Sequence, residues 1–493
     1  MLKRLLIIYT LSRTPIHRMT NQFIQEQYEA AGQAHLFKHL NTLSASDKAT
    51  FFENLTAVAQ RESPSELLED CQTAIKLHED NTDKKSTLEP LPSTSYSSVI
   101  GNPQLEEEYY NLGHKAISAG EVAIILMAGG QGTRLGSSQP KGCFDINLPS
   151  HKSLFQIQAE KIITLQRLCN DCTIPWYIMT SAPTRAATEL FFRDHKYFNL
   201  KKDQIVFFNQ GTLPAFDEEG KKLLLANPTS LVESPDGNGG LYRAIRDNGI
   251  FLSILSQGAL SISYMYCVDN VLSKLADPVF IGFAIKHDFQ LATKAVRKRD
   301  AHESVGLIAT KDGRPCVIEY SEISNELAEA TDEDGLLLLR AGNIVNHYYS
   351  VELLKEKLSQ WCDSMPYHIA KKKIQYFDNT SNTVVKPEEP NGIKLEQFIF
   401  DVFPTSSLER FGCLEVDRTK EFSPLKNGLN SKNDNSETSR QAYLTLGTSW
   451  LKQAGAIVRN NALVEVSNTL SYSGENLTKF KGTVFDKDGL YLE

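Results

Sequence analysis

Hydrophobic residues in the middle of the chain form short runs that are separated by amphipathic segments. Residues 122–127 read Val-Ala-Ile-Ile-Leu-Met and do not alternate with polar residues. Such a run predicts a strand that is buried on both faces, as in a parallel sheet. The same reasoning predicts strands at 176–180, 205–208, 261–266 and 279–282, and helices at 104–119, 153–169 and 184–194. Strands that alternate with helices indicate an α/β core with a mostly parallel sheet.

The N-terminal part of the chain has a helical pattern instead. Apolar residues such as Phe23, Ile24 and Tyr28 recur at helical spacing, and the pattern continues to about residue 76. Ser46 is the expected N-cap of the second helix in this part. A helical N-terminal region is therefore predicted before the sheet begins.

The last hundred residues change character again. Residues 395–401 alternate between apolar and polar, which predicts a strand, and residues 427–439 are polar and are expected to form a mobile loop. A last helix is expected at 440–453. The expected blocks are an extension at 1–18, a helical region at 19–115, a core at 116–394 and a small α+β C-terminal domain at 395–493.

Composition narrows the class of protein. Charged residues make up 23% of the 493 residues, hydrophobic residues make up 41%, and the net charge is −8, which is typical of a soluble globular protein. The sequence has no long basic stretch, so nucleic acid is not expected as a partner. It also has no apolar run long enough for a membrane span. Eight scattered cysteines favour a reducing compartment, and we expect the cytoplasm. Cys169 and Cys172 form an isolated C-x-x-C pair, interpreted as packed thiols near a helix end.

The first eighteen residues leave the location open. They are basic, lack acidic residues and are apolar in their middle, which fits either a targeting presequence or an upstream extension before Met19. We prefer the extension, because no small-residue cleavage site follows.

The loop after the first predicted strand combines glycines with two cations. Its sequence is MAGGQGTRLGSSQPKG, in which Arg134 and Lys141 are the basic residues. Amide groups in a glycine-rich turn can converge on an anion, and the two cations can neutralise phosphates. The ATPase pattern Gly-x4-Gly-Lys-Ser/Thr is missing. The dinucleotide pattern is also missing, because the glycine spacing is one residue too long.

Two further positions favour a phosphorylated ligand. A second glycine cluster, PDGNGG at 235–240, precedes an expected helix, where it is either a close approach to a ligand or a plain helix-entry turn. Asp269 directly follows a predicted buried strand, where ligands bind in open α/β sheets. A carboxylate that faces phosphates needs a cation between them, so Asp269 is the metal candidate for Mg²⁺ or Mn²⁺. The alternative is an aspartate that only caps a turn.

Taken together, these motifs resemble the signature of nucleotide-sugar pyrophosphorylases. The string Asn-Gly-Gly-Leu-Tyr at 238–242 is similar to the eukaryotic UDP-N-acetylhexosamine branch of that family, and so is Ala-Gly-Gln-Ala-His-Leu at 31–36. The resemblance extends from about Tyr28 into the C-terminal region. It implies a Rossmann-like nucleotidyltransferase core with a helical N-terminal region and a small C-terminal domain.

The resemblance also implies roles for individual residues. Arg134, Lys141 and Lys426 would act on the phosphates as catalytic residues. Gln210 follows a predicted strand, and its amide offers both the donor and the acceptor that the uracil edge requires. The implied substrate-binding residues are Met127, Ala128, Gly129, Gly130, Gln210, Gly237, Asn238, Asp269, Glu319, Tyr320, Asn343, Phe398 and Phe400.

Several of these positions have structural alternatives. Glu319 and Asn343 are interpreted as site residues only because they occur in the family's order of motifs. Taken alone, each is more typical of a structural residue. Core packing explains Phe398 and Phe400 equally well, and Lys426 could be an ordinary solvated lysine.

The implied reaction joins UTP and N-acetylglucosamine-1-phosphate to give UDP-N-acetylglucosamine and pyrophosphate. One alternative is a UTP–glucose-1-phosphate uridylyltransferase, and another is a nucleotide-sugar sensor without catalysis. A nicotinamide dehydrogenase is disfavoured by the glycine spacing. The sequence does not decide between a monomer and a homo-oligomer.

Overall fold

The computed structural model describes residues 20–81, 88–258, 260–319 and 322–493. Contacts between the described residues group them into two compact units. Unit 1 is formed within Met1–Lys84, Thr212–Gly237 and Pro366–Gln397, and unit 2 within Lys85–Gly211, Asn238–Met365 and Phe398–Glu493. Among the described residues, no helix is both long and apolar enough to cross a membrane.

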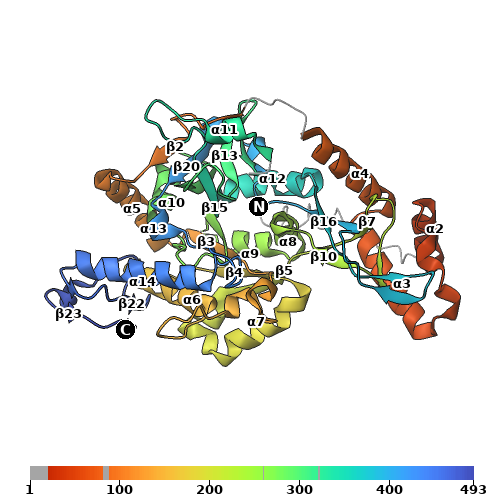
Figure 1. The fold of residues 1–493 in the computed structure, drawn as a ribbon, viewed down its shortest axis with the longest axis horizontal. Coiled ribbons are helices and arrows are strands. Elements are labelled where there is room, and N and C mark those ends of the chain that lie inside the picture. The colour runs from red at the N-terminus through yellow and green to blue at the C-terminus, as the bar shows by residue number, and fades with distance from the viewer. Residues whose placement is uncertain (1–19, 82–87, 259, 320–321) are drawn as a thin grey trace. The chain divides into compact units, whose positions relative to one another are not determined.

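Unit 2 is built around an eleven-stranded sheet (Figure 1). Its main path runs β2 (Tyr96–Ser98), β20 (Phe411–Glu415), β12 (Leu291–Arg297), β15 (Ala341–Ser350), β11 (Ile262–Cys267), β3 (Val122–Met127), β4 (Trp176–Thr180) and β5 (Ile205–Asn209). Three strands lie off this path: β1 (Leu88–Glu89), β13 (Leu307–Lys311) and β14 (Arg314–Ile318). Neighbours on the main path pair in parallel except at β15, which is antiparallel to both β11 and β12. The predicted α/β fold with a mostly parallel sheet is confirmed.

The residues of β3 show why this sheet has two hydrophobic layers. Ile124 and Leu126 belong to one layer, whereas Ala123 and Ile125 belong to the other. The first layer includes residues of α5 (Pro103–Ser118), α6 (Leu154–Leu168), α7 (Ala182–Asp194) and α10 (Pro278–Lys286). The second includes residues of α8 (Leu241–Asp247), α9 (Ile250–Ser256) and α12 (Val351–Ser364). An unbroken apolar run therefore fits a strand that is covered on both faces.

Helices α5 and α10 approach each other through two glycines. A Cβ atom on Gly113 would lie 1.9 Å from the carbonyl oxygen of Pro278, and one on Gly282 would lie 1.7 Å from that of Tyr109. Neither position has room for a side chain, so the two helices pack backbone against backbone.

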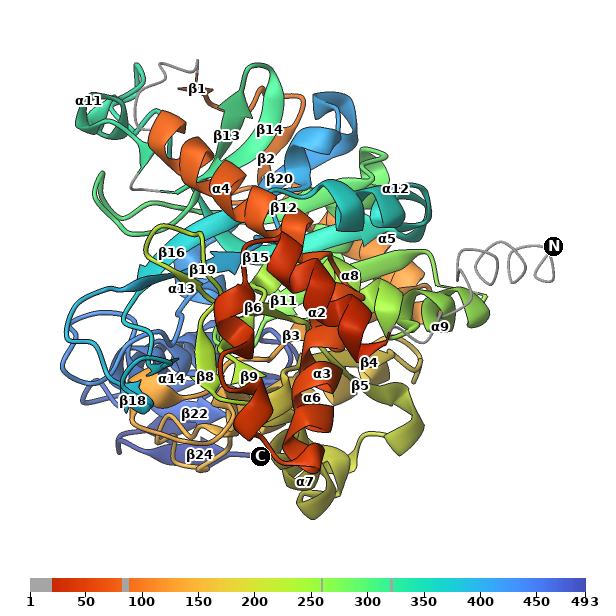
Figure 2. The ribbon, with the colours of Figure 1, turned by 90° about the vertical axis from the view of Figure 1, so that its right-hand side faces the viewer.

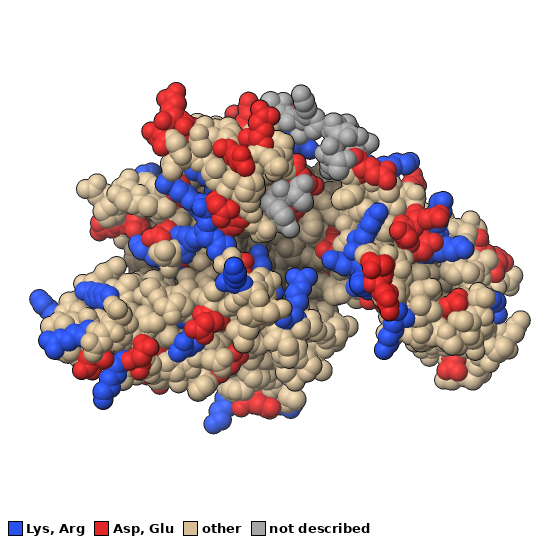
Figure 3. Space-filling model, viewed as in Figure 1, with Lys and Arg blue, Asp and Glu red and all other residues tan. Residues whose placement is uncertain are grey.

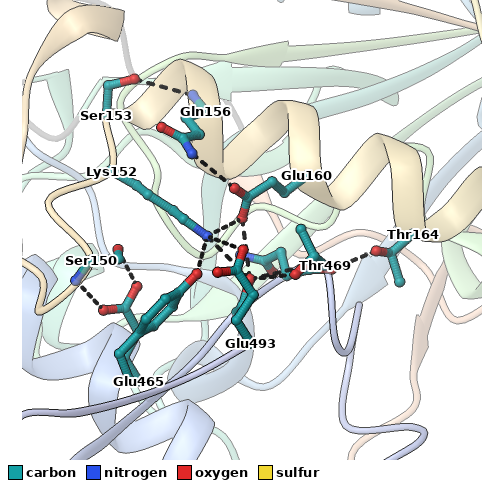
Figure 4. A network of polar contacts seen from close by, with 12 residues as sticks. Ser150, Lys152, Ser153, Gln156, Glu160, Thr164, Glu465, Thr469 and Glu493 are labelled. Atoms are coloured by element: carbon teal, nitrogen blue, oxygen red, sulfur yellow. Dashed lines mark hydrogen bonds and ion pairs between the residues drawn. The ribbon is translucent and has the colours of Figure 1, made fainter. Parts of the chain in front are cut away.

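The C-terminal part of unit 2 contains α13 (Arg418–Glu421), α14 (Ser436–Gln453) and two small parallel sheets. One pairs β21 (Ile457–Val458) with β23 (Val484–Phe485), and the other pairs β22 (Val464–Val466) with β24 (Leu490–Leu492). A buried polar network ties this part to α6 (Figure 4). There the Lys152 ammonium donates to Glu160 Oε2 at 2.8 Å and to the Tyr491 hydroxyl at 2.5 Å. The charge is satisfied on several sides, as a buried ammonium requires.

Unit 1 combines three helices with short strands, and Figure 2 shows its helices from the front. The helices are α2 (Asn21–Ala30), α3 (Ala45–Ala59) and α4 (Pro64–Asn81). The paired strands are β6 (Thr212–Pro214) with β10 (Glu233–Pro235), β16 (His368–Lys372) with β19 (Gly392–Glu396) and β7 (Phe216–Asp217), β17 (Tyr376–Asp378) with β18 (Thr383–Val385), and β8 (Leu225–Asn227) with β9 (Ser230–Leu231). Tyr28, Phe51 and Phe216 lie in its core. Helices α2, α3 and α4 confirm the predicted helical character of the N-terminal region.

Four local predictions are wrong. Residues 279–282 form part of helix α10, because Asp277 caps the segment and Pro278 starts it. The N-cap of α3 is Ser44, whose hydroxyl accepts from the Asp47 N–H. The strand expected at 395–401 ends at Glu396, and a turn follows.

The fourth difference is the boundary between the expected loop at 427–439 and the last helix. Asn435 caps α14, so the last helix begins at Ser436. The residues before it form the expected loop, in which the Asp434 carbonyl accepts from the N–H groups of Lys426 and Asn427. The mobility of this loop stays a prediction.

Candidate functional site

The glycine-rich loop after β3 closes on itself. The Lys141 N–H donates to the Gly130 carbonyl at 3.1 Å, and the Gly132 N–H donates to the Gln139 carbonyl at 3.0 Å. An isolated antiparallel bridge joins Gln131 to Pro140. The loop therefore returns Lys141 to the end of the strand from which the loop starts.

Different features of the structure explain why glycine stands at different positions of this loop. Among the five glycines of this loop, only Gly136 adopts a left-handed conformation, with φ of 77°, which favours glycine. A Cβ on Gly129 would lie 2.0 Å from Gln210 Oε1, so this glycine leaves room for the Gln210 side chain. No atom lies within 4 Å of the corresponding position on Gly130. The backbone at Gly130 is open to a ligand.

Lys141 and Asp269 meet at the carboxyl ends of adjacent strands. Strands β3 and β11 run parallel with Met127 opposite Cys267, and the Lys141 ammonium lies 3.6 Å from Asp269 Oδ2. The two side chains are 19% and 22% exposed, so ligand atoms can reach both. Met127 and Ala128 are buried in opposite hydrophobic layers. They can therefore contact a ligand only through their backbone.

The segment that carries Lys426 is joined to the Asp269 turn. The Leu425 N–H donates to the Asp269 carbonyl at 2.9 Å, and Asn270 forms a bridge with Pro424. The Lys426 side chain is exposed. On the other side of the segment, a Cβ on Gly428 would lie 3.0 Å from the Arg134 carbonyl. Arg134, Asp269 and Lys426 thus belong to connected pieces of backbone.

The pKa of the Cys267 thiol is affected by the charges of Asp269, Lys426 and Lys141. Burial raises the pKa of Cys267, the last residue of β11, and the Asp269 carboxylate raises it further. The ammonium groups of Lys426 and Lys141 act in the opposite direction. Both lysines therefore lie within electrostatic reach of the same strand end, where phosphates would be neutralised.

Several other cations on this unit pair with carboxylates. Lys and Arg side chains gather beside α13 in Figure 3. In this region Arg418 and Arg299 both pair with Glu303, and Arg297 pairs with Glu415. These side chains stabilise local structure and contribute less free charge to a ligand.

The donor set fits a divalent cation that is shared with a ligand. No group of three or more histidine, cysteine, aspartate or glutamate side chains that could hold a metal occurs in the described part of the chain. Asp269 provides one partly exposed carboxylate beside the open loop. Mg²⁺ is commonly bound by one or two carboxylates together with substrate phosphates and water.

Two of the residues expected at the sugar lie close together. The Asn343 N–H on β15 donates to the Gly306 carbonyl at 2.8 Å. A Cβ on the same Gly306 would lie 3.4 Å from Glu319 Oε1. Asn343 is 6% exposed, and its Oδ1 accepts from the Val345 N–H. Its Nδ2 group is the part left for a ligand.

Asn238 lies at the start of a short helical turn that leads into α8. Its Oδ1 accepts from the backbone N–H of Ile399 at 2.9 Å. An N–H can only donate to the oxygen of an amide, so this contact fixes which way the Asn238 side chain is turned.

The remaining predicted positions have mixed outcomes. Phe398 and Phe400 lie in a turn rather than on a strand, because β19 ends before them. Their rings are 5.2 Å apart and pack with the second hydrophobic layer, which supports the core alternative. Gly237 belongs to unit 1, where its φ of 85° and the nearby Gln397 backbone require glycine. Tyr320 lies outside the described residues.

The sequence interpretation missed Ser181. This residue follows β4, and its hydroxyl donates to the Gly129 carbonyl at 2.7 Å, which holds the glycine loop in place. A polar residue directly after a buried strand was the available signal, as it was for Asp269.

The doubly covered, mostly parallel sheet and the cationic loop at its carboxyl edge define an α/β nucleotidyltransferase. The chain matches the model of the UTP–glucose-1-phosphate uridylyltransferase family over residues 70–474, and it belongs to that family.

Individual relatives refine this placement. The chain is 67% identical over 467 residues to the UDP-N-acetylglucosamine pyrophosphorylase of Saccharomyces cerevisiae, covering 94% of this chain and 98% of the relative. A solved structure of the UDP-N-acetylglucosamine pyrophosphorylase from Trypanosoma brucei matches with a TM-score of 0.82 at 26% identity, covering 94% and 95% of the two chains. A UDP-glucose pyrophosphorylase from Leishmania major shares the fold, with a TM-score of 0.55 at 17% identity over 80% and 77% of the chains.

Proposed function

We propose that the protein is a uridylyltransferase that makes UDP-N-acetylglucosamine and pyrophosphate from UTP and N-acetylglucosamine-1-phosphate. The observation that carries this proposal is the Lys141–Asp269 pair beside the open backbone of Gly130. A relative at 67% identity over nearly the whole chain is named for this activity.

The reaction needs no nucleophile from the protein. A phosphate oxygen of the sugar phosphate attacks the α-phosphorus of UTP. The bond from that phosphorus to the oxygen bridging to the β-phosphate breaks, and pyrophosphate leaves with the bonding electron pair. The enzyme therefore acts by positioning the two substrates and by neutralising charge.

Each charged residue has a distinct part in this proposal. Lys141 and Arg134, on the loop after β3, neutralise the phosphates of UTP, and Lys426 approaches them from the segment after α13. Asp269 would hold Mg²⁺ or Mn²⁺ together with phosphate oxygens, and the metal would add positive charge at the leaving group. Gln210, placed against Gly129, pairs with the uracil edge.

The sugar is bound by amide and carboxylate groups. Asn343 donates a hydrogen bond to the sugar through its Nδ2 group, and the Glu319 carboxylate, which also lies against Gly306, accepts hydrogen bonds from sugar hydroxyls. Asn238 contributes a third polar group. An acetamido substituent offers a carbonyl oxygen and an N–H group, which suits such a mixture better than a single hydroxyl does.

Glucose-1-phosphate is the second candidate substrate. The family model bears the name of the glucose enzyme, and the Leishmania structure shares the fold. A sensor without catalysis is a weaker alternative, because a sensor has no need of the three cations around the phosphates.

The cytoplasm is the proposed location. The eight cysteines are all free thiols, which fits a reducing compartment.

The direct test uses purified protein, UTP, N-acetylglucosamine-1-phosphate and Mg²⁺, with the nucleotide product separated by chromatography. We expect UDP-N-acetylglucosamine and pyrophosphate in equal amounts, and a chelator should stop their formation. A protein that binds both substrates but forms no product would support the sensor and overturn the proposal.

A further inference from the structure

A buried chain of hydrogen bonds leads from the middle of the sheet to Asn238. It consists of the His347 ring, the hydroxyls of Tyr349 and Tyr242, and the backbone of Ile399. The Nδ1 atom of His347 lies 3.3 Å from the Tyr349 hydroxyl, and the two hydroxyls lie 2.6 Å apart. The Tyr242 hydroxyl lies 2.6 Å from the Ile399 carbonyl. All four residues are buried.

The direction of every bond in this chain can be deduced. A carbonyl only accepts, so the single proton of the Tyr242 hydroxyl is donated to Ile399. Tyr349 must then donate its own proton to the Tyr242 oxygen. With that proton used, the contact between Tyr349 and His347 requires a proton on His347 Nδ1.

The His347 ring is consistent with this direction. Its Nε2 atom is buried and has no hydrogen-bond partner among the described residues. In the deduced tautomer Nε2 is a bare acceptor. Burial lowers the pKa of His347 to about 3, so the ring stays neutral and keeps this single donor at neutral pH.

Ile399 is held through both its backbone N–H and its backbone carbonyl by one helical segment. Its N–H donates to Asn238 Oδ1, and its carbonyl accepts from Tyr242, four residues further along the same segment. The Asn238 oxygen is therefore occupied. Its Nδ2 group is left to donate to an acceptor oxygen of a ligand, such as a hydroxyl or an acetamido carbonyl.

We propose that Tyr242, Tyr349 and His347 are positioning residues for the sugar phosphate, which act through Ile399 to fix the amide orientation of Asn238. This inference rests on the proposed function and on the sugar contact proposed for Asn238. It adds residues that do not touch the substrate but determine how well the sugar binds.

The first experiment uses substitutions that each remove one hydroxyl group and keep the aromatic ring. Tyr242→Phe and Tyr349→Phe should each raise the KM for N-acetylglucosamine-1-phosphate by about tenfold, because a buried partner loses its hydrogen bond. The KM for UTP should stay unchanged.

Tyr177→Phe is the matched control. Tyr177 lies in the same hydrophobic layer, and within the described part of the chain its hydroxyl forms hydrogen bonds with Ser253 and Gln257. Its removal should lower stability to a similar extent and leave both KM values as they are. Equal effects of the three substitutions on the sugar KM would overturn the proposal.

A double-mutant cycle then tests whether the chain acts through Asn238. Asn238→Ala should weaken sugar binding by itself, and adding Tyr242→Phe to it should have no further effect. Additive losses would show that the tyrosine acts independently of Asn238, and would also overturn the proposal. Failure of the wild-type protein to form product would instead contradict the proposed function.

Discussion

At the scale of single residues, the Lys141–Asp269 pair has little value for stability. The two groups are 3.6 Å apart and partly exposed, and such ion pairs typically contribute less than about 1 kcal/mol. Their position at the carboxyl ends of β3 and β11 is where ligands bind in open α/β sheets. The pair is therefore better explained by the chemistry of phosphates than by folding.

Lys141→Ala should lower kcat by at least about a hundredfold, because the loss of a preorganised charge at the transition state removes roughly 3 kcal/mol of stabilisation. The melting temperature should not change. Lys115→Ala, at an exposed position on α5, is the control and should leave both quantities unaffected. Near-normal turnover of a folded Lys141→Ala protein would contradict its catalytic role.

Asp269→Asn should shift the metal requirement. The neutral amide is a weaker ligand for Mg²⁺, so we expect activity to need a much higher Mg²⁺ concentration, about tenfold or more. A Mg²⁺ titration of initial rates checks this, with Asp203→Asn at an exposed position as the control. An unchanged titration midpoint would make Asp269 a structural residue.

Individual residues show which parts of the site could be predicted from the sequence and which could not. Asp269 could be found because it follows a predicted buried strand, and Lys141 because it belongs to the glycine-rich loop after another such strand. Phe398 and Phe400 could not be placed, because alternation over a few residues does not distinguish a strand from a turn in a core. The contacts of Tyr242, Tyr349 and Ile399 join positions more than a hundred residues apart, and no local pattern predicts them.

At the scale of elements, the backbone contact between α5 and α10 is the most demanding piece of packing. Gly113 and Gly282 face carbonyl groups of the opposite helix at distances that exclude any side chain. The contact packs the two helices together on one face of the sheet, beneath the strands that end at the site.

Gly282→Ala should separate these helices and lower the free energy of unfolding by about 3 kcal/mol, the upper range for overpacking. Chemical denaturation followed by circular dichroism measures the change. Asn111→Ala, at an exposed position of α5, should alter stability by less than about 0.5 kcal/mol. A Gly282→Ala protein as stable as wild type would show that the two helices can shift apart freely.

Helix α10 shows why some elements were predicted as the wrong type. Residues 279–282 are all apolar, and a buried helix and a buried strand share that pattern. Asp277 and Pro278 were the signals for a helix start, and they outweigh the apolar run. Strands β3 and β4 were predicted correctly to the residue, because Gly129 and Gly130 begin two residues after β3 and Ser181 directly follows β4.

At the scale of the whole molecule, the chain forms two units from interleaved segments. The linear blocks at 19–115, 116–394 and 395–493 remain a prediction about domains. A reading along the sequence does not reveal that three separate stretches share the core of unit 1, because that core depends on contacts between distant residues.

Acid should destabilise the protein through a buried neutral histidine. The pKa of His347 is lowered to about 3 by burial, whereas an unfolded histidine titrates near 6.5. Between these values the unfolded state binds the extra proton, so stability falls as the pH is lowered through this window. From pH 6.5 to 5 the loss attributable to His347 is about 2 kcal/mol.

Denaturation midpoints measured across this pH range check the effect, with His347→Gln as the comparison. The variant lacks the titrating group, so its stability should depend less steeply on pH than that of the wild type. His35, whose pKa is also lowered by burial, remains in both proteins and gives a common background. Equal pH slopes would mean that His347 is protonated in the folded protein.

The preference between two sugar phosphates is the sharpest test of the proposed activity. Wild-type protein is given UTP, Mg²⁺ and equal concentrations of N-acetylglucosamine-1-phosphate and glucose-1-phosphate, and the ratio of the two UDP-sugars is measured at early times. This ratio equals the ratio of kcat/KM values. Because a site built to pair polar groups strongly rejects a substrate that leaves them unpaired, we predict an excess of UDP-N-acetylglucosamine of about a hundredfold or more. Equal amounts of the two products, or an excess of UDP-glucose, would contradict the account.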